Sequence, residues 1–411
     1  MIKLYKTSCY SIGIFAFIHI GIVSAQSLPP FSDNNERYKP IIISTFLDQV
    51  NSNNGTLKVR RLGADSATAI SQRAGNLLLS PIITYARGSM YTQSPYVGYN
   101  NPSSNTLGAM VTVEGWGKRS AREAQALAEA NRLNTEMITE SKTIETEAIF
   151  AYIDALRTKL LWQSYQEAII DLASYQSPLA KKNILDFKDI QKVLENDLKF
   201  YAYSLINYLG KSENELPLPI GTLNLEPKSF QISELISQAN SNRADITSTQ
   251  AAIESASANL EVIKASKNID VMPGIYYSET PPYSSSGTSY GSQKSFSFIV
   301  SVPLSNALFN DSDVLSAVNA QTQQEIMLQA TKTKIVTELN QTYLQYQSAK
   351  NRLESSNKAY QTAKHQKNNG ITGVLAFREA QGELFDARTI HAKTLILLQR
   401  LSGDFQVPKF N

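Results

Sequence analysis

The feature that most constrains this chain is an internal repeat with an offset of about 190 residues. The pentapeptide Gln-Val-Asn-Ser-Asn at 49–53 recurs as Gln-Ala-Asn-Ser-Asn at 238–242. Each match is weak alone, but an offset held from about residue 43 to about 403 indicates two structural repeats rather than unrelated domains. Further matches pair Pro81 with Pro273, Leu185 with Leu375 and Phe187 with Phe377.

The repeat divides the chain into five segments. Pro217, Pro219 and Pro227 mark a linker between the two copies. We therefore expect a signal peptide at 1–25, repeat one at 26–210, a linker at 211–230, repeat two at 231–403 and a C-terminal tail at 404–411.

Residues 1–25 have the pattern of a secretory signal peptide. Lys3 and Lys6 precede an apolar stretch, and a small-residue cleavage pattern ends at Ala25. The alternative, an uncleaved anchor, is disfavoured because the apolar stretch is shorter than the roughly 20 residues that span a bilayer. Cleavage would remove Cys9, the one Cys of the 411-residue chain, so we expect an exported protein without disulfides or thiolate metal sites.

Each repeat is predicted to contain an opening helix, two strands, a long helix and a returning helix. Gly210 and Gly403 are expected to end the returning helices. In repeat one the elements are expected at 43–75, 80–91, 105–114, 119–172 and 181–210. In repeat two they are expected at 231–268, 271–280, 293–303, 312–367 and 374–402.

The strands and the loops beside them are rich in Tyr. Residues 295–302 alternate strictly between polar and apolar, which predicts a strand with one wet and one apolar face. Because Tyr suits a boundary between apolar and wet surroundings, we interpret Tyr91, Tyr276, Tyr277 and Tyr290 as membrane-interface aromatics. The alternative is an ordinary soluble hairpin that uses Tyr because it favours strands.

The long helices, about 75 Å each, exceed what a compact domain uses. Alternating spacings of four and three in the second one predict a coiled-coil seam of Ile335, Leu339, Thr342, Tyr346, Ala349 and Leu353. After residue 25 no stretch comes near 18 uninterrupted apolar residues, so a membrane would have to be crossed by strands of a closed barrel. Four strands are too few for a barrel, so three chains sharing twelve strands are expected.

Composition and motifs argue against several other functions. The net charge of +3 provides no large basic field for nucleic acid. There is no His-Glu-x-x-His motif, phosphate-binding glycine loop or nucleophile elbow, so we expect neither an enzyme nor a cofactor. His365 and His391 fall on different predicted helices, so no metal site is expected either.

Taken together, these features resemble the TolC-type outer-membrane efflux and secretion family. The resemblance rests on the duplication, on NSNRADI at 240–246, on VSVPL at 300–304 and on NGITGVLAFREAQGELFDARTIHAKTLILLQRLSG at 369–403. It implies an α+β membrane protein: a homotrimeric channel-tunnel with a shared 12-stranded barrel in outer-membrane lipid and an α-helical barrel in the periplasm. The implied function is a passive exit duct of a tripartite efflux or type I secretion system, opened when a periplasmic adaptor and an inner-membrane pump dock at the helical tips.

The resemblance also implies pore-lining acidic rings near the tips. Family members can carry acids six and nine residues after a tip Gly. Counting from Gly370 gives Ala376 and Glu379, and counting from Ala180 gives Asp186 and Asp189. The residues predicted to make gate or tip contacts are Lys188, Lys367, Gly370, Thr372 and Arg378.

Two alternatives stay open at this point. The tip charges could be solvated side chains on an exposed helix end. The protein could also be a periplasmic or surface coiled-coil scaffold or adhesion protein without a pore, although such a scaffold needs no barrel-length strands. The transported substrate, whether drug, metal ion or protein, and the class of pump are not specified by these patterns.

Overall fold

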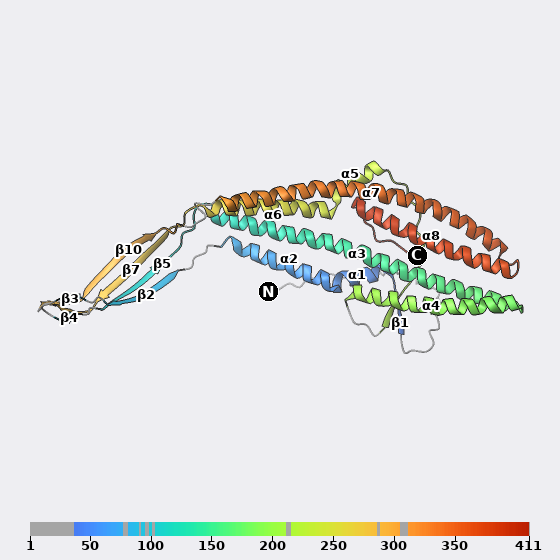
Figure 1. The fold of residues 1–411 in the computed structure, drawn as a ribbon, viewed down its shortest axis with the longest axis horizontal. Coiled ribbons are helices and arrows are strands. Elements are labelled where there is room, and N and C mark those ends of the chain that lie inside the picture. The colour runs from blue at the N-terminus through green and yellow to red at the C-terminus, as the bar shows by residue number, and fades with distance from the viewer. Residues whose placement is uncertain are drawn as a thin grey trace, which may run out of the picture. The chain divides into compact units, whose positions relative to one another are not determined.

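The computed structural model describes residues 37–76, 81–89, 92–94, 98–100, 103–210, 215–285, 288–304 and 311–410. Residues Arg37–Asn411 form one unit, and the expected signal peptide lies outside the described residues. Figure 1 shows long helices that lead from a four-stranded sheet to two helical hairpin turns. Among the described residues, no helix has both the length and the apolar character needed to cross a membrane.

Apart from β1 and β6, which occur only in the first half, the elements follow the same order twice along the chain. The first series is β1 (Arg37–Ile41), α1 (Ile43–Asn53), α2 (Gly55–Ala74), β2 (Ile82–Ser89), β3 (Thr92–Ser94), β4 (Gly98–Asn100), β5 (Ser103–Met110), α3 (Lys118–Ala173), α4 (Pro178–Leu209) and β6 (Glu215–Pro219). The second is α5 (Ile232–Asn242), α6 (Ala244–Ser266), β7 (Met272–Thr280), β8 (Tyr283–Ser285), β9 (Thr288–Tyr290), β10 (Gln293–Ser301), α7 (Ser312–Gln366) and α8 (Ile371–Ser402).

The expectation of a single opening helix in each repeat is wrong. Asn54 separates α1 from α2 and Arg243 separates α5 from α6, each with ψ near the extended value, at 127° and 128°. The side-chain oxygen of Asn54 then caps the new helix by accepting from the Leu57 N–H at 3.3 Å. Short strands also occupy the loops predicted between the longer strands. The predicted linker contains a further strand, β6, which pairs in parallel with β1.

The long helix α3 is the centre of the helix packing. It contacts α2 and α6 along the half nearer the sheet, and α4 and α8 along the other half. Helix α7 packs on α6 in the half nearer the sheet and on α8 in the other half. The order of neighbouring helices is therefore α2-α3-α6-α7 near the sheet and α4-α3-α8-α7 near the hairpin turns. All six side chains of the predicted coiled-coil seam on α7 are buried, which confirms that prediction.

Two Tyr side chains fasten the linker to the long helices. The Tyr152 hydroxyl of α3 donates to the Ile220 carbonyl at 2.7 Å and accepts from the Ile220 N–H at 3.1 Å. The Tyr346 hydroxyl of α7 contacts the Lys228 carbonyl at 2.7 Å and the Lys228 N–H at 2.8 Å in the same way. Since each hydroxyl satisfies both polar groups of one backbone unit, the linker is held to both halves of the chain.

Candidate functional site

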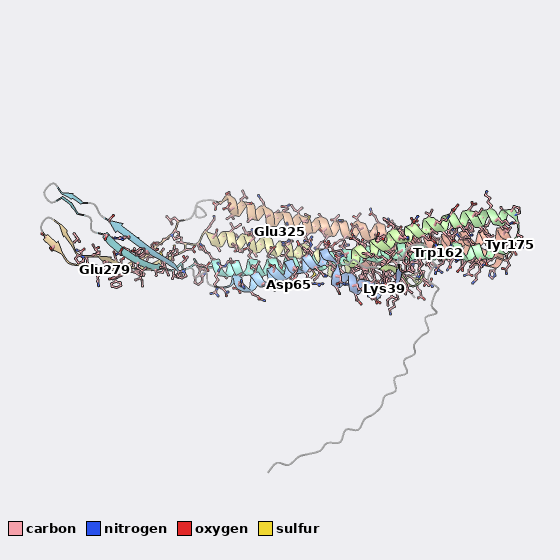
Figure 2. The ribbon with its side chains drawn as sticks, turned by 90° about the horizontal axis from the view of Figure 1, so that it is seen from below. Lys39, Asp65, Trp162, Tyr175, Glu279 and Glu325 are labelled. Atoms are coloured by element: carbon pink, nitrogen blue, oxygen red, sulfur yellow. The ribbon has the colours of Figure 1, made fainter. Side chains whose placement is uncertain are left out.

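Two hairpin turns form the helical tips, at the ends of α3 and α7 away from the sheet. Figure 2 labels Tyr175 in the first turn, whereas Glu279 marks the sheet. In that turn the Ser177 hydroxyl accepts from the Ala180 N–H at 3.1 Å and Pro178 begins α4. Ala180, predicted to stand where the tip Gly would be, therefore lies inside the first turn of the helix.

The second turn depends on glycine. Gly370 directly precedes α8 with φ of +84°, a conformation that other residues rarely adopt. At Gly373 an added Cβ would lie 2.2 Å from the Gln366 carbonyl oxygen, so the end of α7 approaches α8 closely only because no side chain is present. The turn is consequently compact and places Lys367 next to α3.

Lys367 links the two tips within the chain. Its Nζ lies 2.6 Å from Oδ2 of Asp171, in the last turn of α3, and 5.1 Å from the centre of the Phe377 ring. Beneath this pair, Leu172 of α3 packs with Val374 of α8. Asp171 was not among the residues predicted from the sequence, although an acid in the last turn of a helix opposes the helix dipole and could have marked it as a partner for a cation.

Two more ion pairs join α3 to α8 farther from the tip. Asp154 accepts from Lys393 at 2.6 Å, and Arg157 donates to Asp386 at 2.6 Å. Together with the Lys367 pair they fasten the first tip hairpin to the second along one line of contact.

A groove of about 530 Å³ runs between α4 and α8 over the surface of α3. The predicted tip residue Arg378 lies in it, and its guanidinium carbon is stacked 3.5 Å from the centre of the Tyr165 ring. Gly382 allows this stacking, since an added Cβ would lie 2.6 Å from Nη1 of Arg378. Glu379 lines the same groove, so the structure brings two of the predicted residues together there.

The other predicted charges lie elsewhere. Asp186, Lys188 and Asp189 are exposed on α4, outside the set of residues that line the groove. Asp189 makes a surface ion pair with Lys192 at 3.3 Å, with both side chains about three-quarters exposed. Thr372 is exposed in the first turn of α8. Rings of these acids around a pore would need further copies of the chain.

The four-stranded sheet has two chemically different faces. Its strands are ordered β10-β7-β5-β2 and all pairs are antiparallel, so residues that pair directly share a face. One face carries two apolar rows, Tyr85-Leu107-Tyr277-Phe296 and Ile83-Ala109-Ile275-Phe298. The other carries the small or polar rows Thr84-Gly108-Tyr276-Ser297 and Ala86-Thr106-Ser278-Ser295.

The apolar face is open to the surroundings. Phe296 is 79% exposed and Ile83 is 74% exposed. Tyr277 lies on this face and packs against Phe296, with ring centres 5.0 Å apart. Tyr276 points the opposite way and covers Gly108, so Tyr276 and Tyr277 cannot both be membrane-interface aromatics on one face. Tyr91 and the side chain of Tyr290 fall outside the described part of the structure.

Comparison with known proteins gives a consistent assignment. Residues 235–399 match the family described as outer membrane efflux protein, whereas the search of curated proteins found no match. The fold resembles VceC, an outer membrane protein of Vibrio cholerae, at 14% identity and a TM-score of 0.63, covering 88% of this chain and 96% of that one. It also resembles the CmeC outer membrane channel of Campylobacter jejuni, at 13% identity and a TM-score of 0.62, covering 89% of this chain and 87% of that one.

A further solved structure, the open state of the Neisseria gonorrhoeae MtrE outer membrane channel, shares 14% identity at a TM-score of 0.61, with 88% of each chain covered. These likenesses extend over both halves of the chain, whereas the family match lies in the second half. Residues 235–399 thus match the outer membrane efflux protein family, and the chain as a whole shares the fold of solved outer membrane channels.

Proposed function

We propose that this chain is one third of a passive outer-membrane duct, with its sheet in the membrane and its helices in the periplasm. The family that residues 235–399 match is described as outer membrane efflux protein. The observation that carries the proposal is the two-faced sheet, with an exposed apolar face and a small or polar opposite face. In a membrane barrel the apolar face contacts lipid and the polar face lines the lumen.

The edges of the sheet support an assembly of several chains. The outer strands β2 and β10 each pair on one side within the described sheet, and unpaired edges are not tolerated in lipid. Two chains of four strands would give eight, a barrel whose interior side chains fill. Three chains give twelve strands and leave a lumen, so we propose a homotrimer in which β2 of one chain pairs with β10 of the next.

The helices offer matching edges for the same trimer. Helices α2 and α4 lie at one side of the row and α7 at the other. Large apolar side chains are exposed on them, including Val59 on α2, Phe200 on α4 and Leu344 on α7, each at least 65% exposed. Contacts between α7 of one chain and α2 and α4 of its neighbour would cover these side chains and close a helical tube.

At the tip of this tube we propose a gate. The ion pair between Lys367 and Asp171 holds the two hairpins of one chain together and favours the closed state. Asp186, Asp189 and Glu379 are proposed to form threefold acidic rings that favour cations over anions. A periplasmic adaptor and an inner-membrane pump, of the efflux or type I secretion kind, would open the gate by docking at the tips.

The experiment that tests this function is a deletion and complementation assay in the native host. Loss of the gene should raise intracellular retention of exported compounds, and the parent gene should restore export. A version whose apolar sheet face carries Phe296→Asp and Phe298→Asp should be lost from the outer-membrane fraction and should not restore export, because charges on the lipid face oppose insertion. Normal localisation of that version would argue for a scaffold without a pore.

A further inference from the structure

A cleft beside α3 collects three cationic side chains where α8 ends and α6 begins. Lys142 comes from α3, Arg243 from the residue before α6, and Arg400 from the last turn of α8. The cleft has a volume of about 310 Å³, enough for a small ion and several waters. Gly403, with φ of +80°, ends α8 against Asn242 and forms part of the wall.

Arg243 uses only part of its guanidinium. Its Nε donates to Oδ1 of Asp245 at 2.8 Å, and Nη2 donates to the other carboxylate oxygen. Nη1 is buried and has no hydrogen-bond acceptor. Glu338 Oε2 lies 4.0 Å from it, beyond hydrogen-bonding distance. The group is therefore a buried donor without an acceptor, which is rare in folded proteins.

Arg400 lacks a paired carboxylate. It donates to the hydroxyl oxygens of Thr146 at 2.7 Å and Thr143 at 2.9 Å, which leaves further N–H groups of its guanidinium available. Among the described residues no carboxylate oxygen lies within ion-pair distance of it, whereas Lys142 pairs with Glu145 at 3.1 Å. The cleft thus contains a partly buried positive charge that is not neutralised, an arrangement that costs free energy unless an anion is present.

Electrostatics within the chain agree with this geometry. Burial and then the neighbouring Arg243 lower the pKa of Arg400, although Asp245, Glu145 and Glu147 act in the opposite direction. The surrounding carboxylates therefore do not offset the lowering of the Arg400 pKa by burial and by the guanidinium of Arg243.

The corresponding junction of the first repeat has the opposite character. There α4 ends at Gly210 and α2 begins at Gly55, again beside α3. That cleft is lined by Glu140 and Glu147 and by neutral residues, with Asn207 and no Lys or Arg. The cationic cleft is therefore specific to the second junction and does not follow from the architecture alone.

We propose that the cleft between α3, α6 and α8 binds a small oxyanion of the phosphate class, held by the free N–H groups of Arg400, with Lys142 and the partly satisfied guanidinium of Arg243 adding positive charge to a lining that also includes Asp245. Guanidinium groups suit this task because their planar donors match the oxygens of such anions. Lys142, which is about half exposed, lines the cleft. The bound anion ties α6 and α8 to α3 at the point where the two shorter helices meet. This inference does not depend on the proposed duct.

The test uses the full chain purified in detergent, with inorganic phosphate as the probe. Thermal unfolding is followed during a phosphate titration and during a potassium chloride titration of matched ionic strength. We expect a saturable rise in the unfolding midpoint with phosphate only. Arg400→Gln should weaken the apparent affinity at least tenfold, and Lys142→Gln severalfold. Lys358→Gln, which removes an exposed charge from α7, should bind as the parent does.

Equal effects of phosphate and chloride would overturn the proposal. So would an affinity in Lys142→Gln and Arg400→Gln equal to that of the parent. If Arg400→Gln does not fold, the comparison of Lys142→Gln with Lys358→Gln decides. Both side chains are exposed, so neither replacement should disturb the fold, and each variant loses one positive charge.

Discussion

Asp171→Asn cuts the ion pair that joins the end of α3 to the turn between α7 and α8. In the parent the carboxylate and the Lys367 ammonium are 2.6 Å apart, and the two side chains are 31% and 32% exposed. The replacement keeps the size of the side chain and removes its charge. We expect the substituted tip to open more readily, because in the proposed gate the pair connects two hairpins that separate on opening.

The magnitude follows from the exposure of the pair. Solvent screens ion pairs at the surface, and such pairs contribute at most about 1 kcal/mol, so we assign about 0.5–1 kcal/mol to this one. In a trimer that opens in one concerted step, three pairs would contribute about 1.5–3 kcal/mol. Since about 1.4 kcal/mol is a factor of ten, the closed-to-open ratio should fall roughly 10- to 150-fold.

The assay is the open probability of single channels in planar bilayers. The difference between parent and Asp171→Asn should shrink between 0.1 M and 1 M potassium chloride, because the screening length falls from about 10 Å to about 3 Å. Lys367→Gln should match Asp171→Asn, and the double variant should add nothing. Lys358→Gln is the control, because it breaks an exposed pair with Glu354 along one helix. An open probability in Asp171→Asn equal to the parent's would refute the reasoning.

Asp186→Asn combined with Asp189→Asn should lower the cation-to-anion permeability ratio in the same bilayers; an unchanged ratio would remove both residues from the constriction. Tyr346→Phe deletes the hydroxyl that satisfies both backbone polar groups of Lys228. It should lower the free energy of unfolding by about 1–3 kcal/mol in a denaturation assay in detergent. An unaltered free energy would mean that the contact contributes nothing to stability. Burial, with a smaller effect of a nearby lysine, lowers the pKa of His391 below 6.5, so the unfolded chain binds this proton more readily. Stability should therefore be constant above about pH 6.5 and fall below it, and His391→Gln should flatten that decline; identical pH profiles would contradict this.

Much of the fold could be predicted from the sequence because its strongest patterns are local. The seam residues Ile335 to Leu353 recur at coiled-coil spacing, and all six are buried. Gly210 and Gly403 were expected to end helices, and both adopt the left-handed conformation at a helix C-terminus. The alternation at 295–302 placed β10 to within two residues, since a sheet with two different faces requires that period.

The features that were missed depend on tertiary contacts. The helix breaks at Asn54 and Arg243 lie where Gly210 and Gly403 approach the preceding residues, Asn53 and Asn242, at contacts that no local pattern reveals. The pairing of β1 with β6 joins segments far apart in the sequence, and Pro217 and Pro219 argue against a strand unless it lies at an edge.

The candidate site was predicted only in part. Lys367 and Gly370 lie at the turn before α8 and Arg378 lies in the neighbouring groove, and their role in a gate stays a prediction; the contacts of Lys367 with Asp171 and of Arg378 with Tyr165 require α3 to lie beside α8. Tyr276 and Tyr277 were grouped by residue type, although adjacent strand residues must face opposite ways. Rings of Asp186, Asp189 and Glu379 stay a prediction, because one chain cannot display a threefold arrangement.

The measurement that tests the trimeric duct most directly is the mass of the particle extracted from outer membranes in mild detergent. Light scattering with the detergent contribution subtracted gives that mass, and the same fraction is then placed in a planar bilayer. We predict a particle of three chains that conducts ions. A monomer that stays soluble without detergent, or a particle that contains no pore, would contradict the proposed function.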